Sequence, residues 1–124
     1  MRPSKIAILV VLSVVGLTGL AVAGQNKFGV ADNRSLTLTA PTRVGDVLLP
    51  QGVYQVVHTM EGEEHVMVFK QANKREPVEV RVKCKLAPLG QKATRDEQGY
   101  SLNAANERVL HRLIFRGDSA EHVF

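Results

Sequence analysis

Two histidines flank a predicted turn at a spacing that suits a pair of metal ligands on one sheet face. His58 precedes and His65 follows the sequence Glu61-Gly62-Glu63-Glu64. A turn centred on Glu61-Gly62 places His58 opposite His65, whereas a turn one residue later places His58 opposite Met67, because a slip of one residue changes every cross-strand pair. Imidazole and thioether ligands suit a soft ion such as copper. Metal binding through His58 and His65 is therefore an alternative function, and ordinary polar strand residues are the favoured interpretation.

Cys84 and the acidic residues give no support to catalysis. Cys84 is the only cysteine, so an intrachain disulfide cannot form. It alternates with valines and Leu86, which predicts a buried, inert thiol with a raised pKa. Glu61, Glu63 and Glu64 cluster at the predicted turn, where water would solvate them, whereas general acid catalysis needs a desolvated carboxyl. We therefore expect a protein that is not an enzyme and that carries no cofactor.

The candidate binding residues are Arg81, Lys83 and Lys85, which recur at every second position. On a strand they form a row with steps of about 6.5–7 Å, which could meet a polyanion or an acidic protein. The alternative is a solvated face that discourages aggregation between sheet edges. Nucleic acid is not expected, because aromatic residues make up only 5% of the chain and none interleaves with this row.

Short runs rich in Val, Leu and Thr, broken by Gly, Pro, Asn and Asp, indicate strands and turns throughout the chain after residue 34. The cleanest alternation spans 78–86, with one apolar and one charged face. Residues 91–104 are expected to be a polar connection with a turn at 96–99. The pattern predicts an all-β fold, an antiparallel β-sandwich of about seven or eight short strands, with a small closed β-barrel as the alternative. The other expected strands are 35–40, 44–49, 53–60, 65–70, 108–115 and 120–124.

The first 23 residues have the pattern of a signal peptide. Arg2 and Lys5 precede the apolar run 6–15, and Ala21-Val22-Ala23 fits a cleavage site. Cleavage after Ala23 predicts a periplasmic or secreted product with no stable membrane span. Of the 16 basic residues, 14 then remain against 12 acidic ones, and this net charge of +2 is too small to argue for nucleic acid.

The remainder is short enough for one domain. We expect residues 24–34 to form a flexible N-terminal arm and residues 35–124 to form a single β-domain. The charge within that domain is uneven, because residues 70–92 hold seven basic side chains against two acidic ones.

The segment 44–56, with the sequence VGDVLLPQGVYQV, is similar to the V-G-x-x-L-P-x-G-x-Y-x-V hairpin of small exported bacterial β-proteins, many of unknown function. Pro50 presets φ and Gly52 allows a positive φ, so the two predict a tight reversal across which Leu49 and Tyr54 meet. The resemblance implies an exported β-protein. It brings no catalytic residue, cofactor or substrate with it.

Together these patterns predict a non-catalytic exported β-domain with a binding or structural role at the cell envelope. Its partner would be an envelope component or another exported protein, met through the 81–85 face or an exposed sheet edge. A carrier that holds a small apolar ligand in a barrel cavity is a further alternative.

Overall fold

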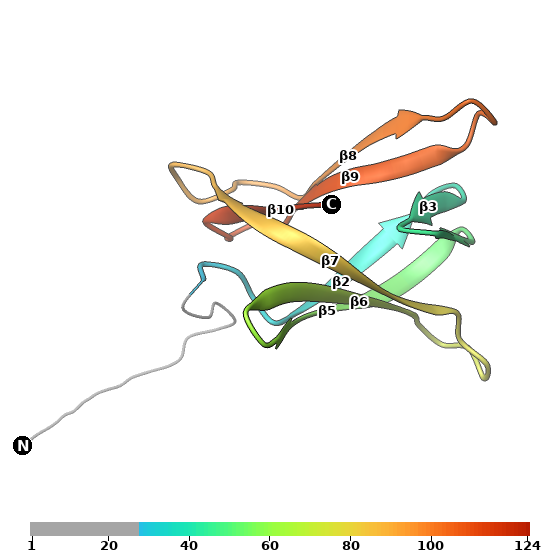
Figure 1. Cartoon of the computed structure of the whole chain (residues 1–124), viewed down its shortest axis with the longest axis horizontal. Coiled ribbons are helices and arrows are strands. Elements are labelled where there is room, and N and C mark those ends of the chain that lie inside the picture. Colours follow the sequence, from blue (N-terminus) through green and yellow to red (C-terminus); the bar gives the residue numbers. More distant parts are fainter. Residues whose placement is uncertain (1–27) are drawn as a thin grey trace, which may run out of the picture.

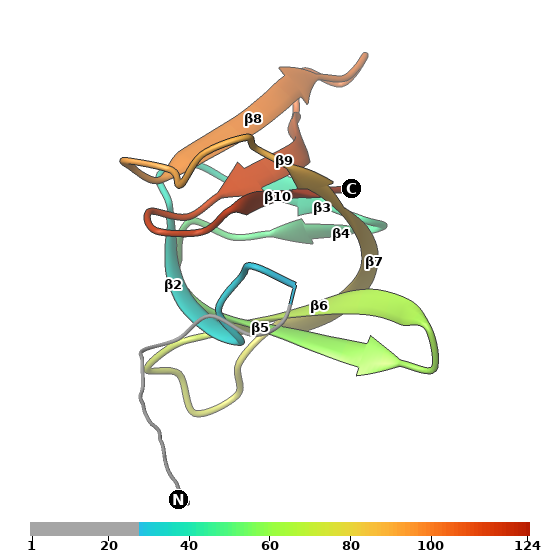
Figure 2. The same ribbon diagram turned by 90° about the vertical axis from the view of Figure 1, so that its left-hand side faces the viewer.

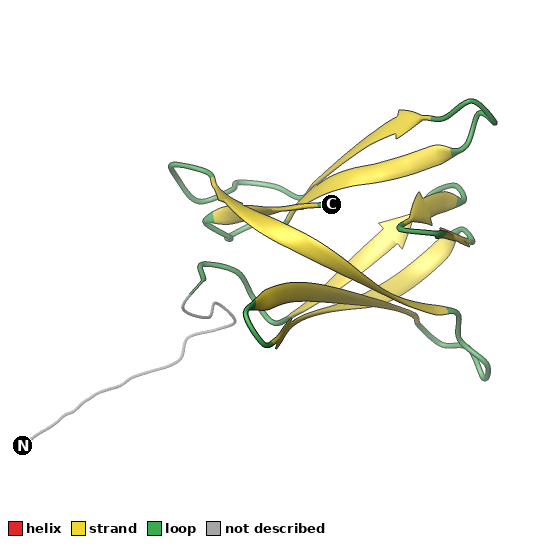
Figure 3. Cartoon of the chain, viewed as in Figure 1, coloured by secondary structure: helices red, strands yellow, loops and turns green. Residues whose placement is uncertain are grey.

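The computed structural model describes residues 28–124, which form strands and turns without a helix (Figures 1 and 3). The predicted signal peptide, residues 1–23, and residues 24–27 lie outside this described part. The strands are β2 (Asn33–Leu38), β3 (Thr42–Val44), β4 (Val47–Leu49), β5 (Gly52–Glu61), β6 (Glu64–Gln71), β7 (Glu79–Pro88), β8 (Glu97–Leu102), β9 (Arg108–Ile114) and β10 (Ala120–Val123).

These nine strands form one open, mostly antiparallel sheet in the order β2-β5-β6-β7-β10-β9-β3-β4, with β8 paired to β9. The all-β prediction is confirmed, but the sheet has more strands than expected and is not purely antiparallel. β3 runs parallel to β9, with Thr42 opposite Arg108. The segment 44–49 is two strands rather than one, because Gly45 has a φ of 60° and turns the chain between Val44 and Val47.

β7 belongs to both halves of the sheet. From Glu79 to Cys84 it pairs with β6, and from Lys85 to Pro88 it pairs with β10. The sheet therefore curls about this strand, and β2 and β7 form opposite walls (Figure 2).

Alternate residues of the strands fill the inside of the curl. On β9 the alternation breaks, because the β8–β9 register shifts at Gly99 and Tyr100 and gives β9 an extra residue. Leu110 and Leu113 therefore both point inward. The buried core also includes Leu36, Leu38, Val44, Leu49, Tyr54, Val56, Met67, Phe69, Cys84 and Phe115.

The segment 44–56 does not form the predicted single hairpin. β4 pairs with β3, and β5 pairs instead with β2 and β6, at the far end of the strand order. Leu49 and Tyr54 are both buried, and the Tyr54 hydroxyl donates to the Pro50 carbonyl at 2.6 Å. The reversal at Pro50 thus carries the chain from one end of the strand order to the other.

β8 occupies residues that the sequence assigns to a polar connection and a turn. All six of its residues are exposed or half-buried, and its apolar side chains alternate only at Tyr100 and Leu102, which is too short a run to mark the strand. The Arg112 side chain packs over Gly99, and a Cβ atom at this position would lie 2.6 Å from Arg112 Cγ, so a larger residue would displace that side chain.

The described part of the predicted arm is packed. We call residues 28–32 the cap, because they lie across one end of the curled sheet (Figure 2). Val30 and Ala31 are buried. The Ser119 amide donates to the Gly29 carbonyl, and the His58 amide donates to the Asp32 carbonyl, both at 2.8 Å.

Candidate functional site

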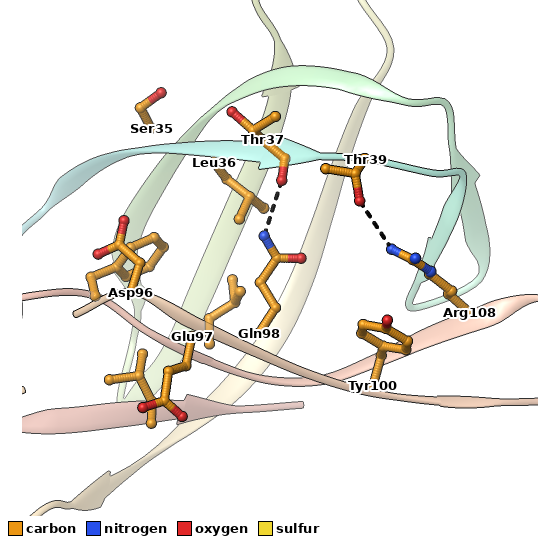
Figure 4. A pocket seen from close by; sticks show the side chains of 12 residues that line it. Ser35, Leu36, Thr37, Thr39, Asp96, Glu97, Gln98, Tyr100 and Arg108 are labelled. Atoms are coloured by element: carbon orange, nitrogen blue, oxygen red, sulfur yellow. Dashed lines mark hydrogen bonds between the residues drawn. The ribbon is translucent and has the colours of Figure 1, made fainter.

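The curled sheet leaves a seam, which we define as the region between the free edge of β2 and strand β8. Within the described residues β2 pairs only with β5, and β8 pairs only with β9. A groove of about 620 Å³ lies along the seam (Figure 4). Its polar lining includes Ser35, Thr37, Thr39, Gln98, Tyr100 and Arg108.

Side chains rather than a backbone ladder hold the seam together. Gln98 Nε2 donates to the Thr37 carbonyl at 3.0 Å, and Arg108 Nη1 donates to Thr39 Oγ1 at 3.3 Å (Figure 4). Within a strand, a residue directs its N–H and C=O toward the same neighbour, and the direction alternates along the chain. Because the Thr37 carbonyl accepts the Gln98 bond, the peptide groups of Ser35 and Thr37 face the seam.

The two ends of the groove differ in charge. At one end the Arg108 guanidinium lies 4.5 Å from the centre of the Tyr100 ring, which is 45% exposed. At the other end are Asp96, which accepts a bond from the Arg116 amide at 2.7 Å, and Glu97 (Figure 4). The groove can therefore recognise peptide groups and opposite charges, but among the described residues that line it no nucleophile is paired with a desolvated base.

A serine–histidine contact lies on the outer face of the β8–β9 pair. Ser101 Oγ is 2.6 Å from His111 Nε2, and both side chains are exposed. Acyl transfer requires in addition a group that orients the imidazole and donors for the oxyanion. Neither accompanies this pair among the described residues, so the contact gives no argument for a hydrolase.

The predicted basic row is largely neutralised. Arg81 forms an ion pair with Glu61, and Lys83 Nζ lies 3.1 Å from a carboxylate oxygen of Glu64. Both acidic residues belong to the β5–β6 hairpin tip, which the register brings alongside β7. Lys85 is exposed on the same strand. The row therefore presents less positive charge than its sequence indicates.

Removing the two acidic partners should uncover this charge. We expect the Glu61→Gln, Glu64→Gln double variant to elute from heparin at higher salt than the wild-type protein, because binding to a polyanion strengthens with each cation left unpaired. The matched control is Glu97→Gln with Glu121→Gln, which changes the net charge equally but frees Arg95 and Arg112 instead. Equal shifts in both variants would mean that only net charge matters.

Cys84 lies where the alternation predicts. It is 7% exposed, and burial raises the pKa of its thiol to about 11. The prediction of a buried thiol is confirmed. In the register of β6 and β7 it stands opposite His65, and the two line a second hollow of about 540 Å³. The thiol is protonated at neutral pH and is not an activated nucleophile.

His58 and His65 take the second of the two registers that the sequence allows. The turn is centred on Gly62-Glu63, so His58 stands opposite Met67 and Met60 stands opposite His65. The two rings nevertheless converge on the inner face, with His58 Nε2 2.9 Å from His65 Nδ1. Within residues 28–124, no group of three or more His, Cys, Asp or Glu side chains is arranged to hold a metal ion.

A third imidazole completes a histidine cluster, which we define as His58, His65 and His122. The ring centre of His58 is 5.1 Å from that of His65 and 5.8 Å from that of His122 on β10. Phe28 of the cap packs edge-on against His65 at 4.8 Å, and Phe115 packs against His122 at 5.8 Å. Sequence reasoning missed His122, although its alternation with Ala120 on the last strand marks it as inward-facing.

Burial disfavours the charged forms of His58 and His122. His58 is 4% and His122 is 1% exposed, and His58 Nδ1 and both His122 ring nitrogens have no hydrogen-bond partner. Desolvation, followed by the charge of His65, lowers the pKa of His58 below its ordinary value. Desolvation, followed by the charge of His58, lowers the pKa of His122 to about 4.

A buried ion pair ties the start of β2 to the turn between β9 and β10. Arg34 Nη2 donates to Oδ1 of Asp118, which is 0% exposed, and the Arg34 guanidinium lies 5.6 Å from the centre of the Phe115 ring. Burial raises the pKa of Asp118, and Arg34 offsets this only in part.

The apolar carrier alternative needs an apolar cavity. Charged side chains line both hollows, among them Asp96 and Arg108 in the first and Lys83 and Lys85 in the second. The second hollow is also lined by Cys84, Val123 and Phe124, so its lining is mixed and the carrier alternative stays a prediction. Among residues 28–124, no helix has the length and apolar character that a membrane crossing requires.

None of the protein-family models, curated proteins or solved structures compared with this chain matches it.

Proposed function

We propose that this protein is a non-catalytic, exported binding domain of the cell envelope, which holds an extended segment of another exported protein along the seam. The observation that supports the proposal is that, among residues 28–124, β2 and β8 each have one edge without a strand partner. These two edges face each other across the groove. Addition of an extended peptide to a free edge is a recurring recognition mode, in which main-chain bonds give affinity and side-chain contacts give specificity.

The charges at the two ends of the groove suggest the orientation of the segment. An acidic residue of the partner would meet Arg108, and a basic residue would meet Asp96, because Glu97 already faces Arg95 and Arg112. Tyr100, which is exposed beside Arg108, offers an apolar surface to a side chain of the partner. The 81–85 face is the weaker candidate for the contact surface, because hairpin carboxylates already pair with Arg81 and Lys83.

The finer architecture of the curled sheet, barrel or sandwich, bears on the same proposal. We infer that the sheet is closer to a barrel with one open seam than to a β-sandwich, because β7 is continuous between the two halves. The side-chain bonds of Gln98 and Arg108 bridge the seam where a closed barrel would have a ladder. The bound segment would supply that ladder. Export to the periplasm or beyond rests on the leader pattern in residues 1–23.

A substitution in the backbone of β2 tests the proposal. We expect Thr37→Pro to weaken peptide binding at least about tenfold, because it removes an N–H that faces the seam, and 1.4 kcal/mol is a factor of ten in affinity. β2 is an edge strand, where proline is tolerated. Thr37→Ala is the matched control, because it keeps the N–H and loses the same side chain.

The probe is a library of ten-residue peptides with an acidic residue near one end and a basic residue near the other. Peptides selected on the wild-type protein are measured by calorimetry against both variants, and hydrogen exchange at Ser35 and Thr37 should slow in the complex. The proposal fails if no peptide binds more tightly than about 100 µM, far weaker than common specific affinities. It fails equally if Thr37→Pro binds as well as Thr37→Ala.

A further inference from the structure

The cap rests directly on the histidine cluster. Phe28 packs against the rings of His65 and His58, with ring centres 4.8 Å and 6.0 Å apart. The carbonyl of Asp32 accepts the backbone amide of His58 at 2.8 Å. Whatever moves the imidazoles therefore disturbs both the side-chain and the backbone contacts that hold residues 28–32.

The bond inside the cluster tolerates one added proton but not two. A neutral imidazole has one N–H donor and one lone pair, so His58 Nε2 and His65 Nδ1 share a single proton across 2.9 Å. If both rings are protonated, two N–H groups face each other at this distance, and the bond is lost. A protonated His122 would bury two N–H groups where the structure supplies no acceptor.

Charges around the cluster do little to favour protonation. On the cap, the charge of Asp32 raises the pKa of His58, but less than desolvation and His65 lower it. From β2, the charge of Arg34 lowers the pKa of His122. Asp118, in the turn before β10, is already paired with Arg34. The other ionisable groups beside His65 line the second hollow, and they are Glu63, Glu64, Lys83, Cys84 and Lys85.

We propose that the histidine cluster is an acid-operated latch, whose protonation releases the cap while the sheet remains folded. This inference stands independently of the seam. In the released state water reaches the cluster and the pKa values of His58 and His122 return toward 6.5, so the open state binds more protons than the closed state. The closed state is therefore fully favoured above pH 6.5 and loses its advantage as the pH falls toward about 4, the pKa of buried His122.

Hydrogen exchange at the amides that bind the cap measures this release in the wild-type protein. The Ser119 amide donates to the Gly29 carbonyl, and the Ala31 amide donates to the Asp118 carboxylate. After correction for intrinsic exchange, we expect both amides to exchange at least about tenfold faster at pH 4 than at pH 7, because the closed state lowers the pKa of His58 and His122. Amides in the β5–β6 ladder should keep their protection, as should the far-ultraviolet circular dichroism of the sheet.

Histidine variants separate the latch from general acid sensitivity. His65→Gln, at a half-buried position, removes the ring that would take up the second proton of the His58–His65 pair. His122→Leu removes a ring that acid would charge. Each should move the midpoint of cap release to lower pH, whereas His111→Gln, at an exposed position on β9, should leave it unchanged. If a variant does not fold, the other still decides the result.

A tryptophan in the cap gives a second readout, because the chain has none. Phe28→Trp should change its fluorescence between pH 6.5 and 4, before the circular dichroism changes. The proposal is overturned if the cap is released and the sheet unfolds at the same pH in the wild-type protein. It is also overturned if His65→Gln and His122→Leu both release the cap at the same pH as His111→Gln.

Discussion

Arg34→Met should lower the free energy of unfolding by about 3–5 kcal/mol, because it leaves a buried carboxylate without its cation. Asp118 is fully buried, and its Oδ2 has no hydrogen-bond partner even with Arg34 in place. Methionine retains an apolar stem over the Phe115 ring, so the loss reports the charge rather than the packing. Urea denaturation measures it as a lower midpoint with an unchanged slope.

The partner variants show which group carries the cost. Asp118→Asn should be less harmful, because the Arg34 side chain is 28% exposed and can turn toward water. The double variant Arg34→Met, Asp118→Leu removes both charges and should be more stable than Arg34→Met alone. A double variant that is less stable than the single one would contradict the assignment of the cost to the unpaired carboxylate.

The loss of unfolding free energy caused by Arg34→Met should also depend on pH. Burial already raises the pKa of Asp118, and loss of the cation raises it further. A carboxyl whose folded-state pKa lies above its unfolded value costs stability as the pH rises and regains it as the pH falls. The difference in unfolding free energy between wild type and Arg34→Met should therefore be larger at pH 8 than at pH 5.

Phe69→Ala is the second large effect, with an expected loss of about 3–5 kcal/mol. Phe69 lies in the middle of β6 and is fully buried, and its ring centre lies 5.8 Å from that of Phe124. The substitution removes a large side chain at a point where β5, β6 and β7 all pack against one another, and the surrounding strands cannot collapse into the space without breaking their ladders.

Two further substitutions on the same strand calibrate this loss. Phe69→Leu should cost clearly less, because it leaves a smaller cavity. Lys70→Ala changes the next residue, which is exposed on the other face, and should stay within about 0.5 kcal/mol of wild type. A loss at Lys70 as large as that at Phe69 would contradict the assignment of β6 faces.

The sequence predicts the strands whose two faces differ in polarity. The alternation over 78–86 locates β7, and the same alternation correctly buries Cys84. β8 is not predicted because none of its residues is buried and its apolar alternation is limited to Tyr100 and Leu102. The division of 44–49 into β3 and β4 depends on the positive φ of Gly45, which the sequence permits but does not require.

The candidate sites are harder to predict, because they depend on pairing between distant segments. The seam joins residues 35–39 to residues 96–108, and no local pattern indicates that β2 and β8 become neighbours. His58 and His65 meet in either register only because they share the inner face, and His122 joins them through β10. The basic row was visible in the sequence, but its neutralisation by Glu61 and Glu64 required the hairpin register.

The parallel pair of β3 and β9 has a consequence for the order of folding. β5, β6 and β7 follow one another through short connections, so this meander can assemble from local contacts. Thr42 can pair with Arg108 only after the intervening chain has closed a long loop. That closure costs conformational entropy before the new contacts compensate it. The β3–β4 hairpin is therefore expected to dock last, and its arrival should set the slowest kinetic phase of refolding.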